Sequence, residues 1–168
     1  MYTRSERVSP KRARSAQGEG LKKPVRDSVE RSIGLDVGTR RIGVALSDAM
    51  GWTAQPLETV QVAPGGEHLS RIAELCRTHS VTELVAGVPF ELSGKAGGMA
   101  KRVRHILAQV SEATGLSVVE VDERLTTRQA DRAMVEAGVG LKDRRKVVDQ
   151  IAAAIILQCH LDAKGRGI

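Results

Sequence analysis

The sequence predicts a single α/β domain in which helices cover both faces of a five-stranded mixed sheet. A length of 168 residues suits one domain, and a hydrophobic share of 41% is enough for a core. The periodic part of the chain starts with an apolar β-hairpin and a third strand, and helical patterns then alternate with short apolar strands. An antiparallel meander followed by such crossover units is typical of a mixed sheet.

The predicted hairpin covers residues 33–48, with the sequence IGLDVGTRRIGVALSD. Apolar residues alternate with small or polar ones on both sides of a short turn, which indicates paired antiparallel strands. One face of the two strands is apolar and should join a core: Ile33, Leu35, Val37, Ile42, Val44 and Leu46. The other face is nearly bare: Gly34, Asp36, Gly38, Gly43, Ala45 and Ser47. We expect this bare face to leave room above Asp36 for a hydrated cation and a phosphate.

The later elements are predicted from their periodicity. Residues 52–60 read as a third strand, after which Pro64 and two glycines break the chain. Apolar residues at helical spacing predict helices over 68–79 and 99–114, and short apolar runs predict strands over 83–88 and 116–121. Two further helices are expected, over 126–137 and from an N-cap at Asp143 to about Asp162.

The net charge of +6 is unevenly distributed along the chain. Residues 1–31 hold nine Lys or Arg and four Asp or Glu, whereas residues 32–168 hold seventeen and sixteen. The first segment lacks periodicity, so we expect a basic disordered extension over 1–31 and a folded domain over 32–168. Basic residues of the domain cluster at 40–41, 101–104 and 142–146. Such clusters suit phosphate contacts, although a basic run is more often a solvated face.

The composition narrows the class of protein further. Cys76 and Cys159 lie far apart in helical patterns, which favours reduced, packed thiols over a disulfide or a zinc site. No apolar run approaches a membrane span and no signal segment is evident, so we expect a cytoplasmic protein without a membrane partner. The only aromatic residues are Tyr2, Trp52 and Phe90. Without a base-stacking platform, a bound nucleic acid would be contacted mainly through its backbone.

Three acids stand out. Asp36 lies inside an apolar strand, where an ionised carboxylate is costly unless it is paired or binds a metal. Glu123 follows the fifth strand, at the end where ligands gather in α/β sheets. Asp149 is expected in the second turn of the last helix, and Ala152 and Ala153 beside it would allow close packing. Each acid also has a simpler interpretation. Asp36 could stabilise a turn, Glu123 could be an ordinary loop residue, and Asp149 could interact with the positive end of the helix dipole.

A convergence of these acids would favour a metal site. Neighbouring carboxylates raise each other's pKa values unless a cation neutralises them. Oxygen ligands favour Mg²⁺ or Mn²⁺ over zinc, and such ions activate water and stabilise the leaving oxygen in phosphodiester cleavage. We therefore expect Asp36, Glu123 and Asp149 to hold one ion or two.

Four motifs resemble the YqgF/RuvX family. They are IGLDVGTRRIGVA at 33–45, GVP at 87–89, DERLTT at 122–127 and VDQIAAAIILQ at 148–158, and the resemblance runs from about residue 33 to about residue 161. It implies an RNase H-like fold, an activity described as Holliday junction resolution and as maturation of the 5′ end of pre-16S ribosomal RNA, and an acidic triad on Asp36, Glu123 and Asp149. The chain departs from the family at Ser93-Gly94, where the usual pattern is Asp-Gly.

Our leading hypothesis is a nuclease of structured nucleic acid that depends on Mg²⁺ or Mn²⁺. Its candidate phosphate contacts are Thr39, Arg40, Arg41, Arg124 and Lys146. A pre-16S rRNA substrate needs one cut and a monomer suffices, whereas a four-way DNA junction needs paired cuts and favours a homodimer. Sugar kinases and actin-like ATPases share the Asp-x-Gly-Thr hairpin, but they need two such domains. The remaining alternative is a noncatalytic module that binds ribosomal RNA or a protein.

Overall fold

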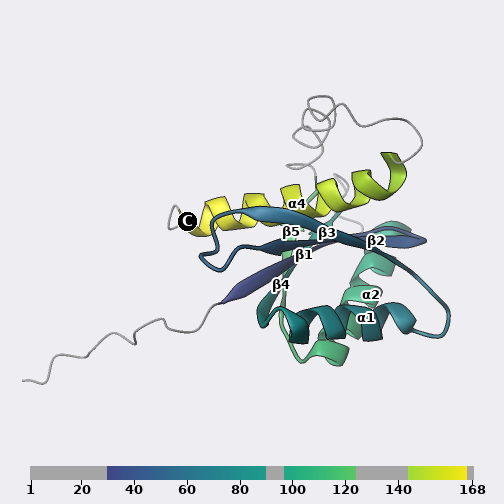
Figure 1. Ribbon diagram of the computed structural model, residues 1–168. Coiled ribbons are helices and arrows are strands. Elements are labelled where there is room, and N and C mark those ends of the chain that lie inside the picture. The colour runs from purple at the N-terminus through teal and green to yellow at the C-terminus, as the bar shows by residue number, and fades with distance from the viewer. Residues whose placement is uncertain (1–29, 90–96, 124–143, 166–168) are drawn as a thin grey trace, which may run out of the picture.

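The computed structural model describes residues 30–89, 97–123 and 144–165. They form one sheet between two helical layers, with α4 across one face and α1 and α2 on the other (Figure 1). The elements along the chain are β1 (Arg31–Val37), β2 (Arg41–Ser47), β3 (Ala54–Gln61), α1 (Glu67–Thr78), β4 (Val81–Val88), α2 (Gly98–Thr114), β5 (Val118–Asp122) and α4 (Arg144–Gly165).

The sheet is mixed, with the strand order β3-β2-β1-β4-β5. The predicted hairpin is confirmed, because β1 and β2 pair antiparallel with Asp36 opposite Gly43. β4 pairs parallel with both β1 and β5. The carboxyl ends of β1, β4 and β5 therefore lie along one edge of the sheet, which we call the carboxyl edge.

Apolar side chains fill both layers between the sheet and the helices. The apolar hairpin face lies in a core, as predicted, and the larger cluster joins it to α1 and α2; this cluster includes Leu35, Val44, Ile72, Leu84 and Val103. The smaller cluster lies under α4 and consists of Ala45, Val85, Ala153, Ile156, Leu157 and Leu161. Helix α4 is thus fixed to the sheet along its length by its own apolar residues.

The expectation of an open, bare hairpin face was wrong, because α4 packs on that face. A Cβ atom at Gly34 would lie 2.6 Å from the carbonyl oxygen of Ala153, and one at Gly43 would collide with the backbone of Asp149. Small residues on a strand let another backbone approach closely, and here that backbone is a helix of the same chain. Asp36, near the end of β1, keeps partial exposure.

The other predicted elements are confirmed with shifted ends. β3 begins at Ala54 and not at Trp52, because the Asp48 carboxylate accepts hydrogen bonds from the backbone N–H groups of Trp52 (2.7 Å) and Thr53 (3.3 Å) and closes a turn. α4 continues to Gly165, beyond the predicted end. The predicted helix over 126–137, its successor's N-cap at Asp143, the Ser93 loop and most of the predicted basic extension, residues 1–29, lie outside the described residues.

Both cysteines are free, as predicted, with Cys76 buried in α1 and Cys159 half-buried in α4. Within residues 30–89, 97–123 and 144–165, no helix has both the length and the apolar character of a membrane span.

Candidate active site

Asp36 and Asp149 are brought together by the packing of α4 on the hairpin. Asp36 is the last residue but one of β1, and Gly43 lies opposite it on β2. The backbone of Asp149 passes directly over Gly43, at the position where any other residue would carry a side chain. The missing side chain of Gly43 therefore allows the second turn of α4 to reach the carboxyl edge beside Asp36.

Glu123 reaches the same edge from the parallel half of the sheet. It follows β5 directly, and its backbone N–H donates a hydrogen bond of 3.2 Å to the carbonyl oxygen of Val88, the last residue of β4. Val121, two residues earlier, packs against the cluster beneath α4. Glu123 thus continues the sheet on the edge where Asp36 and Asp149 lie.

The electrostatics of Asp36 show that the three acids are neighbours. Burial, and then the negative charges of Glu123 and Asp149, together raise the pKa of Asp36 from 3.8 to about 7. A carboxylate that is removed from water and faces two like charges holds its proton more tightly. The structure therefore brings together all three acids that the sequence singled out.

Arg41 provides a positive charge at this acidic cluster. Its Nε lies 2.8 Å from Oδ2 of Asp149, and both side chains are only partly exposed, at 32% and 21%. Arg41 opens β2 directly after the turn, in which the N–H of Gly38 donates to the carbonyl oxygen of Arg41 at 2.8 Å. The ion pair therefore links the hairpin to α4 at the carboxyl edge.

The three acids suit a hard divalent cation in their chemistry. All the donors are carboxylate oxygens, which Mg²⁺ and Mn²⁺ prefer. Oδ2 of Asp149 is buried and receives no hydrogen bond in the described part of the chain, since Arg41 approaches it without hydrogen-bond alignment. Among the described residues, however, no three His, Cys, Asp or Glu side chains lie close enough to hold a metal ion as they stand. The chemistry of the donors and the orphaned Oδ2 of Asp149 therefore fit such an ion.

The turn between β1 and β2 carries exposed cations next to the acids. Thr39 and Arg40 are exposed in this turn, and Nη2 of Arg102 donates a 3.1 Å hydrogen bond to the carbonyl oxygen of Thr39. This contact brings the first turns of α2, including the exposed Lys101, to the same edge. In the described part of the chain, Arg40, Lys101 and Arg102 have no carboxylate within ion-pair distance.

The predicted phosphate contacts fall into three groups. Thr39 and Arg40 lie beside the acids and are exposed. Arg41 lies there too and pairs with Asp149, and its contact with a phosphate stays a prediction. Arg124 and the side chain of Lys146 lie outside the described residues.

Two further residues matter that the sequence reasoning did not assign to the site. Arg102 belonged to a recognised basic cluster, but its contact with Thr39 depends on the tertiary structure. A usable signal existed, because a helix that follows a parallel strand starts at the carboxyl edge. Gly43 was read as part of an open floor, whereas it admits α4.

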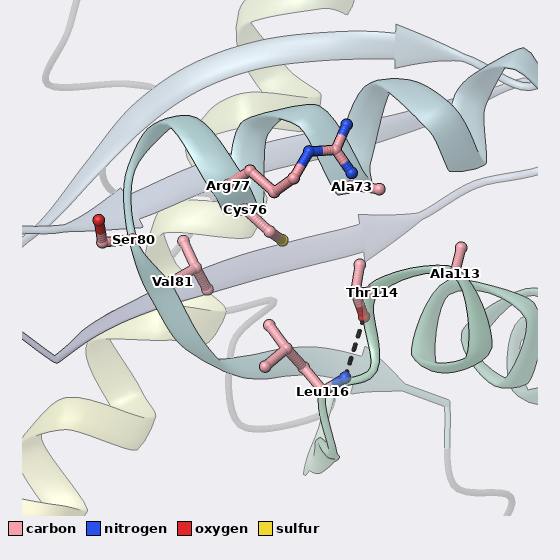
Figure 2. A pocket seen from close by; sticks show the side chains of 8 residues that line it. All are labelled: Ala73, Cys76, Arg77, Ser80, Val81, Ala113, Thr114 and Leu116. Carbon is pink, nitrogen blue, oxygen red and sulfur yellow. Dashed lines mark hydrogen bonds between the residues drawn. The ribbon is translucent and has the colours of Figure 1, made fainter.

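A hollow of about 280 Å³ elsewhere in the molecule does not resemble an active site. Figure 2 shows it between the ends of α1 and α2, lined by Cys76, Arg77, Ser80, Val81, Thr114 and Leu116 among others. It lies where β4 begins, at the end of the sheet away from the acids. Burial raises the pKa of the Cys76 thiol to about 11, so the nucleophilic thiolate is scarce at neutral pH.

The fold and the acidic edge define an RNase H-like α/β protein, as the sequence predicted. The structure resembles that of T. thermophilus RuvC in complex with a Holliday junction substrate, with a TM-score of 0.53 and 20% identity over 81% of this chain and 96% of that one. At this level of identity the likeness shows the fold alone.

The chain belongs to the RuvX family, whose sequence model is described as "Holliday junction resolvase" and matches residues 30–163. Its relatives include a protein of Moorella thermoacetica named "Putative pre-16S rRNA nuclease", which is 46% identical over 81% of this chain and 97% of its own length. A protein of Bacillus cereus with the same name is 42% identical over 80% of this chain and 99% of its own. These matches confirm the family resemblance.

Proposed function

We propose that this protein is a metal-dependent nuclease that hydrolyses phosphodiester bonds in structured nucleic acid. The observation that carries the proposal is the placement of Asp36 beside Glu123 and Asp149, which raise its pKa together with burial. Acids so arranged are costly for a protein that only binds. Membership of a family described as resolvases, with relatives named as rRNA nucleases, supports the same activity.

Asp36, Glu123 and Asp149 are the proposed ligands of Mg²⁺ or Mn²⁺. When bound, such an ion activates water and stabilises the leaving oxygen. Asp36 must be ionised to act as a ligand, so the cation competes with the proton that the raised pKa favours, and cation binding weakens as the pH falls. α4 and β2 hold Asp149 over Gly43, which fixes the backbone of one ligand relative to the other.

The exposed cations at the carboxyl edge are the proposed contacts for the nucleic-acid backbone. Arg40 in the turn, and Lys101 and Arg102 on α2, lie on one edge with the acids. Arginine and lysine bind phosphates irrespective of base sequence, and the register they set would place one phosphate at the acids. This arrangement suits recognition of the shape of a junction or of a precursor end.

The experiment that tests the activity is the Asp36→Asn variant. We expect it to lose Mn²⁺-dependent cleavage while it still binds nucleic acid, because the backbone contacts are unchanged. The readouts are cleavage of labelled substrates and binding by fluorescence anisotropy. Arg77→Gln, which removes a charge at the far end of the sheet, serves as the control and should cleave normally. Cleavage by the Asn variant at the wild-type rate would contradict the assignment.

The substrate is tested by assaying two candidates in parallel, a four-way DNA junction and a 5′-extended 16S rRNA precursor. Symmetric paired cuts in the junction require two active sites, so they should coincide with a homodimer in sedimentation. Trimming of the precursor requires one cut and is compatible with a monomer. The names of the relatives favour the RNA substrate, and the description of the family model favours the junction.

One observation favours a second candidate, a noncatalytic nucleic-acid-binding module. The described acids are not gathered tightly enough to hold a metal ion as they stand. Binding of both substrates without cleavage of either, in Mg²⁺ and in Mn²⁺, would support the module over the nuclease.

A further inference from the structure

The ion pair between Arg41 and Asp149 involves an atom that a cation would need. Nε of Arg41 lies 2.8 Å from Oδ2 of Asp149. That oxygen is buried and receives no hydrogen bond in the described part of the chain. Its only positive neighbour there is therefore the guanidinium of Arg41, held by charge and not by an aligned hydrogen bond.

The same pair lies at the acidic cluster. The charges of Glu123 and Asp149 act on Asp36, so the three acids are near each other. Yet no three such side chains among the described residues are close enough to bind an ion. The guanidinium of Arg41, at 2.8 Å, occupies one side of Oδ2 of Asp149, where a cation bound to that oxygen would also lie.

The side chain of Arg41 has room to move away from Asp149. Its side chain is 32% exposed, and it follows Thr39 and Arg40 in the turn that also contacts Arg102. A long, flexible side chain at this position can leave Asp149 and stay at the same edge, among the proposed phosphate contacts. Partly exposed ion pairs are weak, so a divalent cation can displace it.

We propose that Arg41 is an exchange residue, which pairs with Asp149 in the metal-free protein and passes to a substrate phosphate when a divalent cation takes Asp149. This inference rests on the proposed metal-dependent nuclease function. Arg41 then acts as a counter-ion that keeps the acids from repelling each other before the ion arrives. After the exchange, it neutralises a phosphate beside the acids.

The exchange makes binding of the cation and of nucleic acid cooperative. The cation releases Arg41 for the phosphate, and the phosphate holds Arg41 away from Asp149. By linkage, each ligand must strengthen the other by the same factor. If Arg41 only oriented Asp149, its replacement would have the opposite effect on metal affinity, because the loss of that orientation would weaken metal binding.

The test measures Mn²⁺ affinity without nucleic acid, by titration calorimetry, for the wild type and for Arg41→Gln. We expect Arg41→Gln to bind Mn²⁺ about three-fold more tightly, since a competing partly exposed ion pair has been removed. Arg41→Lys retains a charge and should resemble the wild type. Arg40→Gln removes the same charge one residue away and should change the affinity by less than half as much.

The second measurement is the anisotropy of a labelled four-way DNA junction, with and without Ca²⁺, a hard cation that takes oxygen ligands and is used here to slow cleavage. In the wild type the cation should strengthen junction binding about five-fold or more, and in Arg41→Gln this gain should shrink at least by half. A gain of equal size in both proteins would overturn the exchange.

The outcomes separate this inference from the function on which it rests. Weaker or unchanged Mn²⁺ binding by a folded Arg41→Gln variant, as judged by its thermal melting, would overturn the exchange and leave the nuclease proposal standing. A wild type that binds no Mn²⁺ at all, with or without the junction, would overturn both.

Discussion

The Cα atom of Gly43 lies directly beneath the backbone of Asp149, so that a Cβ atom on Gly43 would overlap the carbonyl oxygen of Asp149. Gly43 also lies opposite Asp36 in the hairpin. One glycine therefore sets how closely a strand acid and a helix acid approach. The geometry of the candidate site depends on a residue that has no side chain to take part in the chemistry.

Gly43→Ala should accordingly damage both stability and activity. The added methyl group forces α4 off the hairpin, and overpacking of this kind costs about 1–3 kcal/mol. Because α4 carries Asp149, we expect Mn²⁺-dependent cleavage to fall by more than the loss of folded protein explains. Urea denaturation and cleavage rates measured on the folded fraction provide the check.

Gly98→Ala is the matched control for that substitution. Gly98 starts α2, and a Cβ atom there meets nothing within 4 Å. Alanine is a better helix former than glycine, so the change in the free energy of unfolding should stay within about 1 kcal/mol and favour the folded state. If both alanine variants behaved alike, α4 would not be packed on Gly43 as described.

The sequence predicted the strands and helices well because their signals are local. The alternation in the hairpin and the helical spacing around Ile72 and Val103 each depend on neighbours in the chain. The acids could also be named, because Asp36 was out of place in its strand and the family motifs included Glu123 and Asp149. Their proximity is a property of the fold, and the effect of their charges on Asp36 supports it.

The tertiary partners were beyond the reach of sequence patterns. The glycines at positions 34 and 43 indicate that another group approaches the strands closely. They do not indicate whether that group is a phosphate or a helix more than a hundred residues away in the sequence. Arg41 was named as a phosphate contact because it is basic and follows the turn. Its pairing with Asp149 depends on the path of α4 over β2, which periodicity does not specify.

The pKa of Asp36 predicts how stability changes with pH in the metal-free protein. Burial, and then Glu123 and Asp149, raise this pKa from 3.8 to about 7. A raised folded-state pKa favours folding below the unfolded pKa, and that advantage is lost as the pH rises to about 7. Asparagine does not ionise. In EDTA, Asp36→Asn should therefore gain stability relative to the wild type between about pH 4 and pH 8, by about 4 kcal/mol, because a difference of one in pKa is worth about 1.4 kcal/mol.

Asp48→Asn gives the opposite sign and serves as the comparison. The pKa of Asp48 is lowered chiefly by the hydrogen bond from the backbone N–H of Trp52; desolvation opposes this effect, and hydrogen bonds from Thr53 and Gly51 lower the pKa further. A lowered pKa in the folded state stabilises the fold above the pKa of the unfolded state. The free energy of unfolding of Asp48→Asn should therefore fall relative to that of the wild type as the pH rises through the acidic range. Chemical denaturation at several pH values checks both variants. A difference between Asp36→Asn and the wild type that did not vary with pH would contradict the buried, repelled carboxylate.

Neither cysteine should take part in the chemistry. Cys76 is 6% exposed, and burial raises its thiol pKa to about 11. The pKa of Cys159 is also raised, by burial and then by Asp162. In native protein at pH 7.5 we expect iodoacetamide to label Cys76 far more slowly than in urea. Cys76→Ala should retain Mn²⁺-dependent cleavage, and loss of cleavage in a folded Cys76→Ala variant would point to a thiol nucleophile.

Arg102 should contribute one phosphate contact to nucleic-acid binding. It lies on α2 with its guanidinium at the carbonyl oxygen of Thr39, next to the acidic cluster. Each phosphate that a protein neutralises adds about 0.9 to the slope of log affinity against log salt for duplex DNA. Arg102→Gln should therefore weaken junction binding at low salt and reduce that slope by about one. Arg71→Gln is the matched control, because Arg71 of α1 already pairs at 2.7 Å with Glu58 of β3 and with Glu74 of α1, which neutralise its charge. Its slope should equal that of the wild type. If Arg71→Gln lowered the slope as much as Arg102→Gln, binding would depend on net charge alone. The proposed phosphate contact at the carboxyl edge would then be wrong.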